Sequence, residues 1–427
     1  MKQQELQKVR EAFGMTEYKL GNGLRVLHRY DDSAPIVALM VTYHVGSRNE
    51  AVGHTGSTHI LEHLLFKDSK NFNKANGKSP TGYLEELGAQ MNATTWLDRT
   101  NYFELLPSSE ISEAIALEAD RMRYSLFSAE DLATEMTVVR NEFERGRNRP
   151  EELLEEAVWA TAFMAHPYHH PTIGWKEDIE NSSAEKLRDF YNRFYYPNNA
   201  TVTLIGDLKK EEMRALVLKH FAPLPPSKEA IPGVHTKEYE QEGLRTVEVE
   251  GQGEMELALV AQKMPAGSDP KYAAFLVLAQ VLAGGLASRL DDALVDQGKA
   301  VYVHPFMHAM HDPSLFTLVA QATPGVKATD LVERISFELN KVQKSGITAS
   351  ELARAKEQIL AQSAYERDGI LSEAWAVSEA IAAGDWQLTY TKEAAVLAVT
   401  LADVKKIAAE TMSKKTRTVG LLSPRRT

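Results

Sequence analysis

Apolar and polar positions follow the same order in the two halves of this chain. Each half begins with short alternating runs, which predict strands, and continues into a helix and then longer helices. The stretch from about 129 to 163 is rich in helix-forming residues and lacks glycine and proline except at Gly146 and Pro150. Short apolar runs at 199–206 and 416–423 predict a final strand in each half. The order of elements therefore predicts an α+β fold.

A proline-rich segment separates the two halves. Four prolines fall within the ten residues 223–232, which favours an extended linker over a packed element. We therefore predict an N-terminal domain at 1–221, a linker at 222–234 and a C-terminal domain at 235–427. The repeated order indicates a divergent duplication of one unit, in which helices pack against a mostly antiparallel sheet.

The start of the chain and its apolar runs bear on where the protein resides. Residues 1–13 predict a short polar helix and lack the apolar core of a signal peptide. No apolar run reaches the roughly 18 residues that a membrane span needs. A native start at Met1 predicts a cytoplasmic protein, whereas removal of a signal peptide would leave a periplasmic protein with the same appearance.

Composition excludes several classes of protein. The chain of 427 residues has a net charge of -11 and no cluster of Lys and Arg beyond a short tail at Arg425-Arg426, which argues against a nucleic-acid-binding face. It has no cysteine, so a disulfide framework, a thiolate metal site and a cysteine nucleophile are all excluded.

The segment His59-Ile60-Leu61-Glu62-His63 carries the most specific chemistry. Positions i, i+3 and i+4 share one face of a helix, so a helix here presents two imidazoles and a carboxylate together. Two neutral histidines one turn apart suit a divalent metal such as zinc, and Glu62 is placed beside metal-bound water. This inverted His-x-x-Glu-His order indicates a metal-dependent hydrolase.

A catalytic zinc ion needs a third protein ligand and one open position. Glu142 lies in the helical stretch after residue 129, and Glu135 lies seven residues earlier, on the same helical face. One of these two carboxylates can bind the metal while the other holds a ligand histidine in the correct tautomer.

Several segments together resemble one family. The run Gly53-His-Thr-Gly56-Ser-Thr-His59-Ile-Leu-Glu62-His63 is similar to the pattern Gly-x-x-Gly-x-x-His-x-x-Glu-His. Further matching segments are 22–26 and 46–50, similar to the strands before that helix, and 88–95, 166–168 and 196–200 after it. The chain therefore resembles the pitrilysin or insulinase family of zinc peptidases, which includes insulin-degrading enzyme and the mitochondrial processing peptidase. The resemblance is specific from about 19 to 208 and weaker beyond.

The resemblance implies a processing-peptidase-like fold of two homologous domains, with the metal site in the first. It identifies the later glutamate, Glu142, as the ligand beside His59 and His63 of one Zn2+ per chain. We place Glu62 and Glu135 among the catalytic residues, with Glu62 as the general base for zinc-bound water. The expected function is a zinc-dependent endopeptidase that hydrolyses peptide bonds of unfolded peptides or small proteins.

Substrate contacts are expected on a strand edge. The segment 88–95 resembles the active-site edge strand of the family, so Asn92, Ala93 and Thr94 are expected to bind an extended peptide through its main chain. In the second half, Tyr302 matches a substrate-binding tyrosine of the family. The arginine expected seven residues earlier is replaced by Val295.

The missing arginine predicts a partner subunit. A preorganised donor at such a site is worth roughly a hundredfold in rate, so its loss matters. Half-length members of the family pair, and one chain can supply what the other lacks. We therefore expect a heterodimer with a homologous non-catalytic subunit that keeps the arginine, or otherwise a homodimer.

Competing interpretations remain for the chain and for its smaller motifs. The alternative function is a non-catalytic or scaffold subunit, although such chains characteristically lose one of the motif residues. The spacing of His166, His169 and His170 matches no standard metal site, and a loop is expected there. Gly284 and Gly285 predict a helix-ending turn, and Gly21 to Gly23 predict a hairpin turn.

Overall fold

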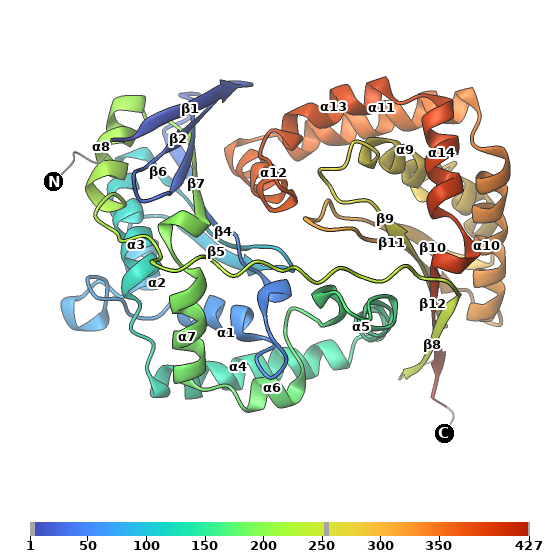
Figure 1. Ribbon diagram of the computed structural model, residues 1–427, viewed down its shortest axis with the longest axis horizontal. Helices are drawn as coiled ribbons and strands as arrows, with labels where there is room; N and C mark the ends of the chain where they lie inside the picture. The colour runs from blue at the N-terminus through green and yellow to red at the C-terminus, as the bar shows by residue number, and fades with distance from the viewer. Residues whose placement is uncertain (1–4, 252–255, 426–427) are drawn as a thin grey trace. The chain divides into compact units, whose positions relative to one another are not determined.

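The computed structural model of the protein describes residues 5–251 and 256–425 (Figure 1). Internal contacts divide the chain into two compact units, each built from three segments. Unit 1 consists of Met1–Glu142, Pro171–His235 and Arg367–Ala382. Unit 2 consists of Phe143–His170, Thr236–Glu366 and Ala383–Thr427. Each half of the sequence thus contributes one segment to the unit that is formed mainly by the other half. The predicted domain boundary at 222–234 stays a prediction.

Unit 1 is built on a seven-stranded sheet in the order β1-β2-β3-β7-β4-β6-β5. Its strands are β1 (Gln7–Ala12), β2 (Met15–Lys19), β3 (Arg25–Tyr30), β4 (Ile36–Tyr43), β5 (Gln90–Thr95), β6 (Thr100–Pro107) and β7 (Ala200–Gly206). Neighbouring strands are antiparallel except for the parallel pair β3 and β7. The strand β5 is therefore an edge strand, bonded along its length to β6 alone among the named strands.

The helices of unit 1 come from both halves of the sequence. They are α1 (Ser57–Leu64), α2 (Pro80–Glu86), α3 (Ile111–Tyr124), the first part of α4 (Ala129–Arg147), α6 (Lys176–Glu180), α7 (Ala184–Phe194), α8 (Lys210–His220) and α12 (Ile370–Ala383). Short 3₁₀ helices occur at Ser47–Asn49, Lys74–Asn76, Ser108–Glu110 and Pro197–Asn199. The helix α12 is the late segment that packs in this unit.

The helices α3 and α12 cover opposite faces of the unit 1 sheet. Successive side chains of a strand point to opposite faces. On β6, the Tyr102 ring lies 4.8 Å from the guanidinium of Arg121 on α3. The next residue, Phe103, packs edge-on against Trp375 of α12 with ring centroids 4.9 Å apart. The sheet is therefore enclosed between an early helix and a late one.

Unit 2 is built on a five-stranded sheet in the order β10-β11-β9-β12-β8. Its strands are β8 (Arg245–Gly251), β9 (Leu257–Met264), β10 (Ala300–Phe306), β11 (Ser314–Ala322) and β12 (Arg417–Pro424), and only β12 and β8 pair in parallel. Its helices are α5 (Pro150–Ala162), α9 (Tyr272–Ala283), α10 (Ala328–Ser345), α11 (Ala349–Glu366), α13 (Leu388–Ala398) and α14 (Leu401–Thr411). Short elements are 3₁₀ helices at Pro167–His169 and Lys414–Thr416 and a π-helix at Asp291–Val295.

The early helix α5 packs on the strands β8, β9 and β12 of unit 2. The alternate residues Ala258 and Val260 of β9 belong to a buried core with α9, α10 and α14. Lys263, which has the opposite parity on β9, reaches the α5 end and donates to the carbonyl of Ala162 at 2.8 Å. The two faces of this sheet are thus covered by different helices.

Most predicted elements are confirmed. The fold is α+β, with two sheets of mostly antiparallel strands packed with helices. The helical stretch after residue 129 forms α4 and α5, which are separated between Arg147 and Pro150. The final strand of each half is β7 or β12, Gly284 caps the end of α9, and the turn at 21–23 joins the antiparallel strands β2 and β3.

Two predicted elements are wrong. Residues 7–12 form the strand β1 and not a helix, because Phe13 and Gly14 both adopt positive φ, 55° and 76°, and so make a two-residue hairpin turn onto β2. The segment 46–50 is not a strand but holds a 3₁₀ helix. The backbone N–H of Ser47 donates to the Trp96 carbonyl at 3.1 Å, so this segment binds a turn and not a neighbouring strand.

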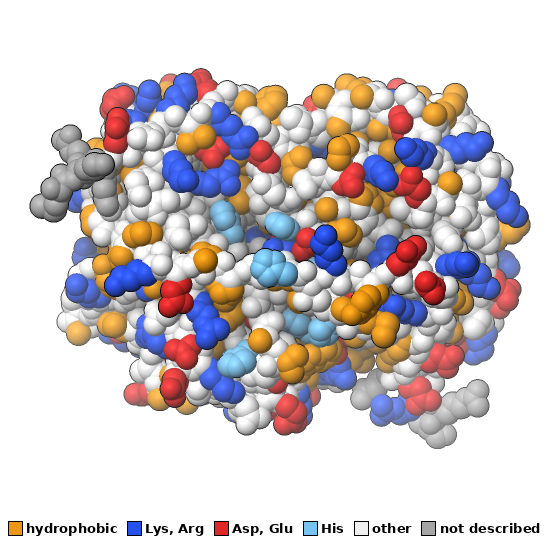
Figure 2. All heavy atoms as spheres, in the orientation of Figure 1, with side chains coloured by type: hydrophobic (Ala, Val, Ile, Leu, Met, Phe, Trp, Pro, Cys, Tyr) orange, Lys and Arg blue, Asp and Glu red, His pale blue; other side chains and the backbone are white. Residues whose placement is uncertain are grey.

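The surface charge and the helix lengths relate to two expectations, the absence of a nucleic-acid-binding face and the absence of a membrane span. Basic and acidic side chains are interspersed on the face drawn in Figure 2, in keeping with the net charge of -11. Within 5–251 and 256–425, every helix is too short or too polar to cross a membrane.

Candidate metal centre

The helix α1 is fixed at its N-terminus by a buried carboxylate. Glu50 accepts hydrogen bonds from the backbone N–H of Gly56 at 2.8 Å and of Thr58 at 2.7 Å. These donors have no partner within the helix, so the two carboxyl oxygens of Glu50 satisfy groups that would otherwise be unbonded. Burial raises the pKa of the Glu50 carboxyl to about 8, and the two backbone donors oppose that rise.

The loop before α1 is held by a second acid and by a close backbone contact. Asp178 accepts hydrogen bonds from the backbone N–H groups of Gly53 and Thr55, and from the Thr55 hydroxyl at 2.7 Å. Gly56 has a φ of 85°, and a Cβ added at Gly174 would lie 2.5 Å from the Gly56 nitrogen. Only glycine therefore fits at these two positions.

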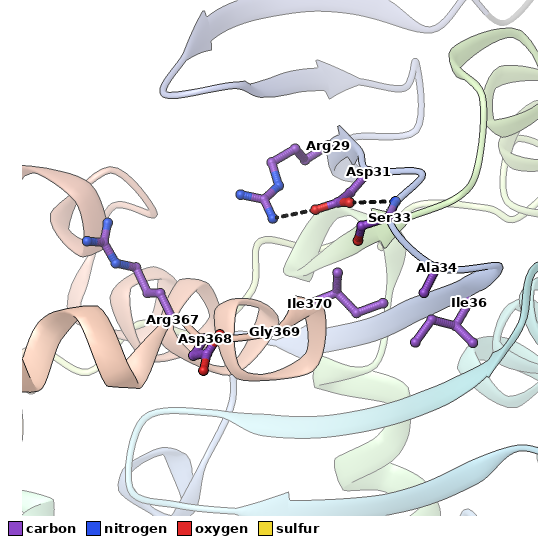
Figure 3. Close-up of a pocket in the computed structure, with 9 residues that line it drawn as sticks. All are labelled: Arg29, Asp31, Ser33, Ala34, Ile36, Arg367, Asp368, Gly369 and Ile370. Atoms are coloured by element: carbon purple, nitrogen blue, oxygen red, sulfur yellow. Dashed lines mark hydrogen bonds and ion pairs between the residues drawn. The ribbon is translucent and has the colours of Figure 1, made fainter.

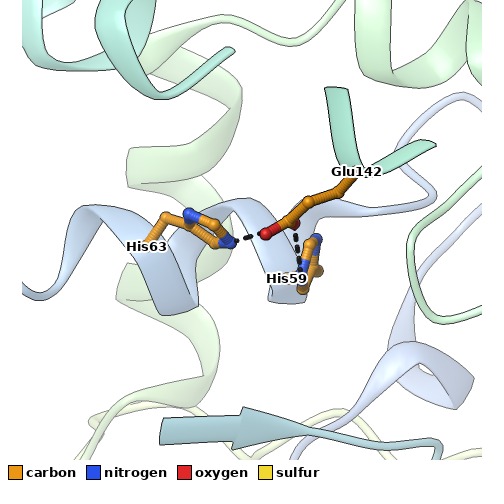
Figure 4. A group of neighbouring side chains, drawn as sticks. All are labelled: His59, His63 and Glu142. Carbon is orange, nitrogen blue, oxygen red and sulfur yellow. Dashed lines mark ion pairs between the residues drawn. The ribbon is translucent and has the colours of Figure 1, made fainter. Parts of the chain in front are cut away.

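The two histidines of α1 and one glutamate of α4 converge on one point (Figure 4). The Glu142 Oε2 lies 3.6 Å from His59 Nε2 and 3.5 Å from His63 Nε2. One ligand atom from each of these residues lies within 4.8 Å of the others. Two imidazole nitrogens and one carboxylate oxygen are a donor set that suits zinc in a catalytic site. The Glu142 side chain is 36% exposed, which leaves access for water and a peptide.

His59 is prepared to act as a ligand by its burial. Burial and the neighbouring His63 ring lower the pKa of His59 to about 3, so its imidazole is neutral at physiological pH. Within the described part of the chain, its buried Nδ1 has no hydrogen-bond partner. Its Nε2 faces Glu142, and in the tautomer with the proton on Nδ1 this nitrogen offers a metal its lone pair.

Glu135 holds the second histidine from the opposite side. Its Oε2 lies 3.1 Å from His63 Nδ1, and its Oε1 lies 2.5 Å from Lys67 Nζ. A carboxylate at Nδ1 favours the tautomer with the proton on that nitrogen, so Nε2 is free to bind a metal. The pair of acids seven residues apart thus lies around His63 as the sequence predicts.

Glu62 lies between the two histidines in sequence and is held by the edge strand. The Thr95 hydroxyl at the end of β5 donates to Glu62 Oε2. Burial raises the pKa of the Glu62 carboxyl above its usual range, and the Thr95 hydroxyl opposes that rise. A raised pKa brings a carboxylate closer to the range in which it can both accept and return a proton.

The expected substrate-binding residues are divided between the units. Asn92, Ala93 and Thr94 lie on the edge strand β5 in unit 1. Tyr302 lies on β10 in unit 2, where its hydroxyl donates to Glu151 of α5. Val295 ends the π-helix of unit 2 and packs against the buried core. Their substrate-binding roles stay predictions.

Sequence reasoning missed the residues that support the site. Glu50 lies in a matched segment, but its capping role depends on a fold-back of the chain onto α1 that no local spacing reveals. Asp178 lies more than 120 residues from the loop that it binds. The run Thr94-Thr95 near Arg99 gives a weak signal, because two hydroxyls beside an expected active-site strand are candidates for orienting a carboxylate.

Other histidines form no comparable centre. Within 5–251 and 256–425, the triad on α1 and α4 is the one group of three or more His, Asp and Glu close enough to hold a metal. His166 pairs with Asp312 at 3.2 Å and precedes the 3₁₀ helix Pro167–His169. The predicted loop at His166, His169 and His170 is therefore largely a 3₁₀ turn.

A cavity of about 460 Å³ opens at the far end of β4 from the metal centre (Figure 3). At about 3.3 Å per residue, the ends of β4 are roughly 23 Å apart. Two arginines and two aspartates are among its lining residues, and Arg29 is already bonded to Asp31 at 3.4 Å and to Glu373 at 2.5 Å. The lining residues are Arg29, Asp31, Ser33, Ala34, Ile36, Arg367, Asp368, Gly369 and Ile370. The cavity thus offers no excess charge to select a ligand.

Comparison with known proteins places these features in a family. Residues 25–176 match the family model Insulinase (Peptidase family M16), and residues 181–359 match the model Peptidase M16 inactive domain. The chain is 33% identical over 343 residues to the zinc protease PqqE of Helicobacter pylori, which covers 79% of this chain and 76% of that protein.

Solved structures agree with this match. The crystal structure of a protease from Helicobacter pylori has a TM-score of 0.90 at 28% identity and covers 96% of this chain and 99% of its own. The peptidase M16 inactive domain from Pseudomonas fluorescens shares the fold, with a TM-score of 0.85 at 19% identity over 97% of this chain and 98% of its own. The chain therefore belongs to the insulinase family, peptidase family M16, and is a zinc protease of that family.

Proposed function

We propose that this protein is an endopeptidase that binds one zinc ion through His59, His63 and Glu142 and cleaves flexible peptides or unfolded small proteins. The observation that carries the proposal is the approach of the three ligand atoms to within 4.8 Å of one another, beside a glutamate held by the edge strand. Bound zinc polarises the peptide carbonyl and lowers the pKa of water toward neutrality.

The proton transfers fall to Glu62. Its carboxylate takes a proton from the attacking water and then delivers that proton to the leaving amine nitrogen, so the peptide C–N bond breaks and one water molecule is consumed. The Thr95 hydroxyl orients this carboxylate through its hydrogen bond. Glu135 keeps the proton of His63 on Nδ1, which leaves Nε2 as the ligand atom.

An extended substrate is proposed to add to the edge strand β5. Among the named strands β5 pairs with β6 alone, so its other edge can accept a peptide strand through main-chain hydrogen bonds. Such a peptide would have to compete with the hydrogen bond that the Ala93 N–H now donates to Asn92 Oδ1 at 2.9 Å. Main-chain recognition tolerates many side chains but requires an unfolded segment. We therefore expect cleavage of unstructured peptides in preference to stable folded proteins.

A second subunit is proposed to complete the site. Val295 stands where the family resemblance implies an arginine, and Tyr302 remains. The proposed partner is a homologous non-catalytic subunit that carries the arginine, with a second copy of this chain as the other arrangement.

The substitution Glu62→Gln tests the proposed chemistry. The glutamine side chain would keep the shape of the glutamate but could not accept a proton, so cleavage of an unstructured peptide should fall by at least about a hundredfold. Zinc content, measured by atomic emission after dialysis, should equal that of the wild type. Turnover that survives in the zinc-loaded variant would exclude Glu62 as the general base.

A further inference from the structure

The edge strand β5 is bonded from both of its faces at its last two residues. Thr95 points to the face of α1, where its hydroxyl donates to Glu62. Thr94 points to the opposite face, as alternation along a strand requires. There the Thr94 carbonyl accepts a hydrogen bond from Arg99 Nη1 at 3.1 Å, and the Thr94 hydroxyl lies 2.8 Å from the same nitrogen.

Arg99 is a buried residue that connects this strand to the late helix α12. It follows the turn after β5, where the backbone N–H of Trp96 donates to the Arg99 carbonyl at 2.9 Å, and only 7% of its surface is exposed. Its Nε and Nη2 both donate to Glu379 Oε1 on α12, with Nε at 3.0 Å. One guanidinium thus binds Thr94 with one nitrogen and Glu379 with the other two.

The helix α12 is itself anchored to the sheet beside Arg99. Trp375, Ser378 and Glu379 lie at i, i+3 and i+4 and share one helical face. The Trp375 ring lies 5.5 Å from the Arg99 guanidinium. Ser378 donates to Asn101 Oδ1 at 2.8 Å. This face of α12 is therefore fixed to β6, next to Arg99, which bonds Thr94 of β5.

We propose that Arg99 and Glu379 are positioning residues of the active centre, which hold the end of β5 so that Thr95 orients Glu62 and the strand edge accepts a peptide. This inference rests on the proposed function of Glu62. Glu379 lies 280 residues after Arg99, so the second half of the sequence contributes to catalysis through a helix that packs in unit 1.

A fixed, planar guanidinium suits this role better than a lysine. Its nitrogens bond two partners at once in set directions, whereas a lysine ammonium is a single flexible charge. Among the residues that the structure describes, Glu379 meets the strand through Arg99, so the two residues should behave as one unit in catalysis.

The substitutions Glu379→Gln and Arg99→Gln test the proposal in the zinc-loaded protein. Each should lower kcat/KM for an unstructured peptide by about tenfold to a hundredfold, since misplacement by about 1 Å costs on that order. The double variant should lose no more than R99Q alone. Zinc content should stay at the wild-type level in all of them.

Glu373→Gln is the matched control. Glu373 lies on the same helix and pairs with Arg29 at 2.5 Å, but Arg29 is on β3, which three strands separate from β5. If α12 matters only for stability, E373Q and E379Q should lower activity alike. A loss in E379Q that does not exceed the loss in E373Q, or losses that multiply in the double variant, would overturn the proposal.

Hydrogen–deuterium exchange gives a readout independent of cleavage. E379Q should speed exchange of the β5 amides at 90–95 relative to both the wild type and E373Q. This measurement tests the positioning role even if R99Q folds poorly. If the zinc-loaded wild type cleaves no peptide, the proposed function fails, and exchange alone then judges the positioning role. Equal exchange of 90–95 in E379Q and E373Q would exclude that role.

Discussion

Two carboxylates on the helix α4 face different nitrogen atoms of His63. Glu142 faces the Nε2 atoms of both histidines, whereas Glu135 faces His63 Nδ1 and is also paired with Lys67. The physical difference is the nitrogen that each acid meets. An acid at Nδ1 fixes the ring and raises the basicity of Nε2, while an acid at the Nε2 side completes the donor set.

Glu135→Gln should therefore weaken zinc binding without removing a ligand. The neutral amide still reaches His63 but no longer places a negative charge behind a ring that binds a cation, so the zinc affinity should fall by about tenfold to a hundredfold. Competition with a chromogenic chelator measures this change. Glu144→Gln, also on α4 but outside the triad, serves as the control with unchanged affinity, and an E135Q affinity equal to that of the control would contradict the assignment.

Lys263 is expected to make the free energy of unfolding of unit 2 depend on pH. Burial lowers the pKa of Lys263 to about 7, although the chain's own Glu238 opposes that shift. The unfolded chain has the usual lysine pKa of about 10.5, so between about pH 7 and 10.5 it binds more protons than the folded state. The contribution of Lys263 to the free energy of unfolding is therefore most favourable above that range and is lost as the pH falls toward 7.

Lys263→Met removes this dependence. Relative to the wild type, the variant should gain more unfolding free energy at pH 7 than at pH 10, as measured by urea denaturation at the two pH values. The exposed Lys271 pairs with Glu410 at 2.7 Å, and this contact raises its pKa, so Lys271→Met should not show that trend. A difference between K263M and wild type that is the same at both pH values would contradict the prediction.

At the scale of elements, the helix α5 and the strand β12 pack at a distance that only glycine permits. A Cβ added at Gly420 would lie 2.4 Å from Val158 Cγ2 and 2.8 Å from Leu154 Cδ1. Both neighbours are fully or almost fully buried, so neither can move into solvent. The early helix thus belongs to the core of unit 2.

Gly420→Ala should destabilise unit 2 by roughly 1–3 kcal/mol, the usual cost of overpacking a core. Differential scanning calorimetry should detect the loss. A comparable substitution at Gly243, where an added Cβ meets nothing within 4 Å, is the control and should change the stability little. Equal stability of G420A and the wild type would show that α5 and β12 pack less closely than described.

At the scale of the whole molecule, the chemistry is unevenly distributed. The three proposed metal ligands, Glu62 and the edge strand all lie in unit 1, while Tyr302 and Val295 lie in unit 2. With valine at 295, the chain lacks the donor that the family resemblance implies, and a partner subunit is the proposed source. The proposal predicts an activity that depends on assembly.

Sedimentation velocity combined with a peptidase assay over the same concentrations tests this dependence. Specific activity should rise with the dimer fraction, or on addition of a homologous subunit that carries the arginine. The E62Q variant serves as the inactive control, since it should still assemble. Full specific activity in a purely monomeric sample would refute the need for a partner.

Local sequence determined much of this protein. The spacing of His59, Glu62 and His63 needs only one helical turn, and the pair Glu135 and Glu142 needs only two, so helix geometry alone places each set on one face. The α+β class and the ends of α4, α5 and α9 follow from helix propensity and from glycine and proline positions. By contrast, β1 was missed because it exists only through its pairing with β2.

Tertiary structure decided what local patterns cannot encode. Glu50 caps α1 only because the chain folds back on itself, and α12 and α5 each pack in a unit built mainly from the other half of the sequence. Arg99 and Glu379 are 280 residues apart, and no periodicity links them. Short-range order is set by backbone geometry within a few residues, whereas contacts between distant segments depend on which surfaces can be buried together.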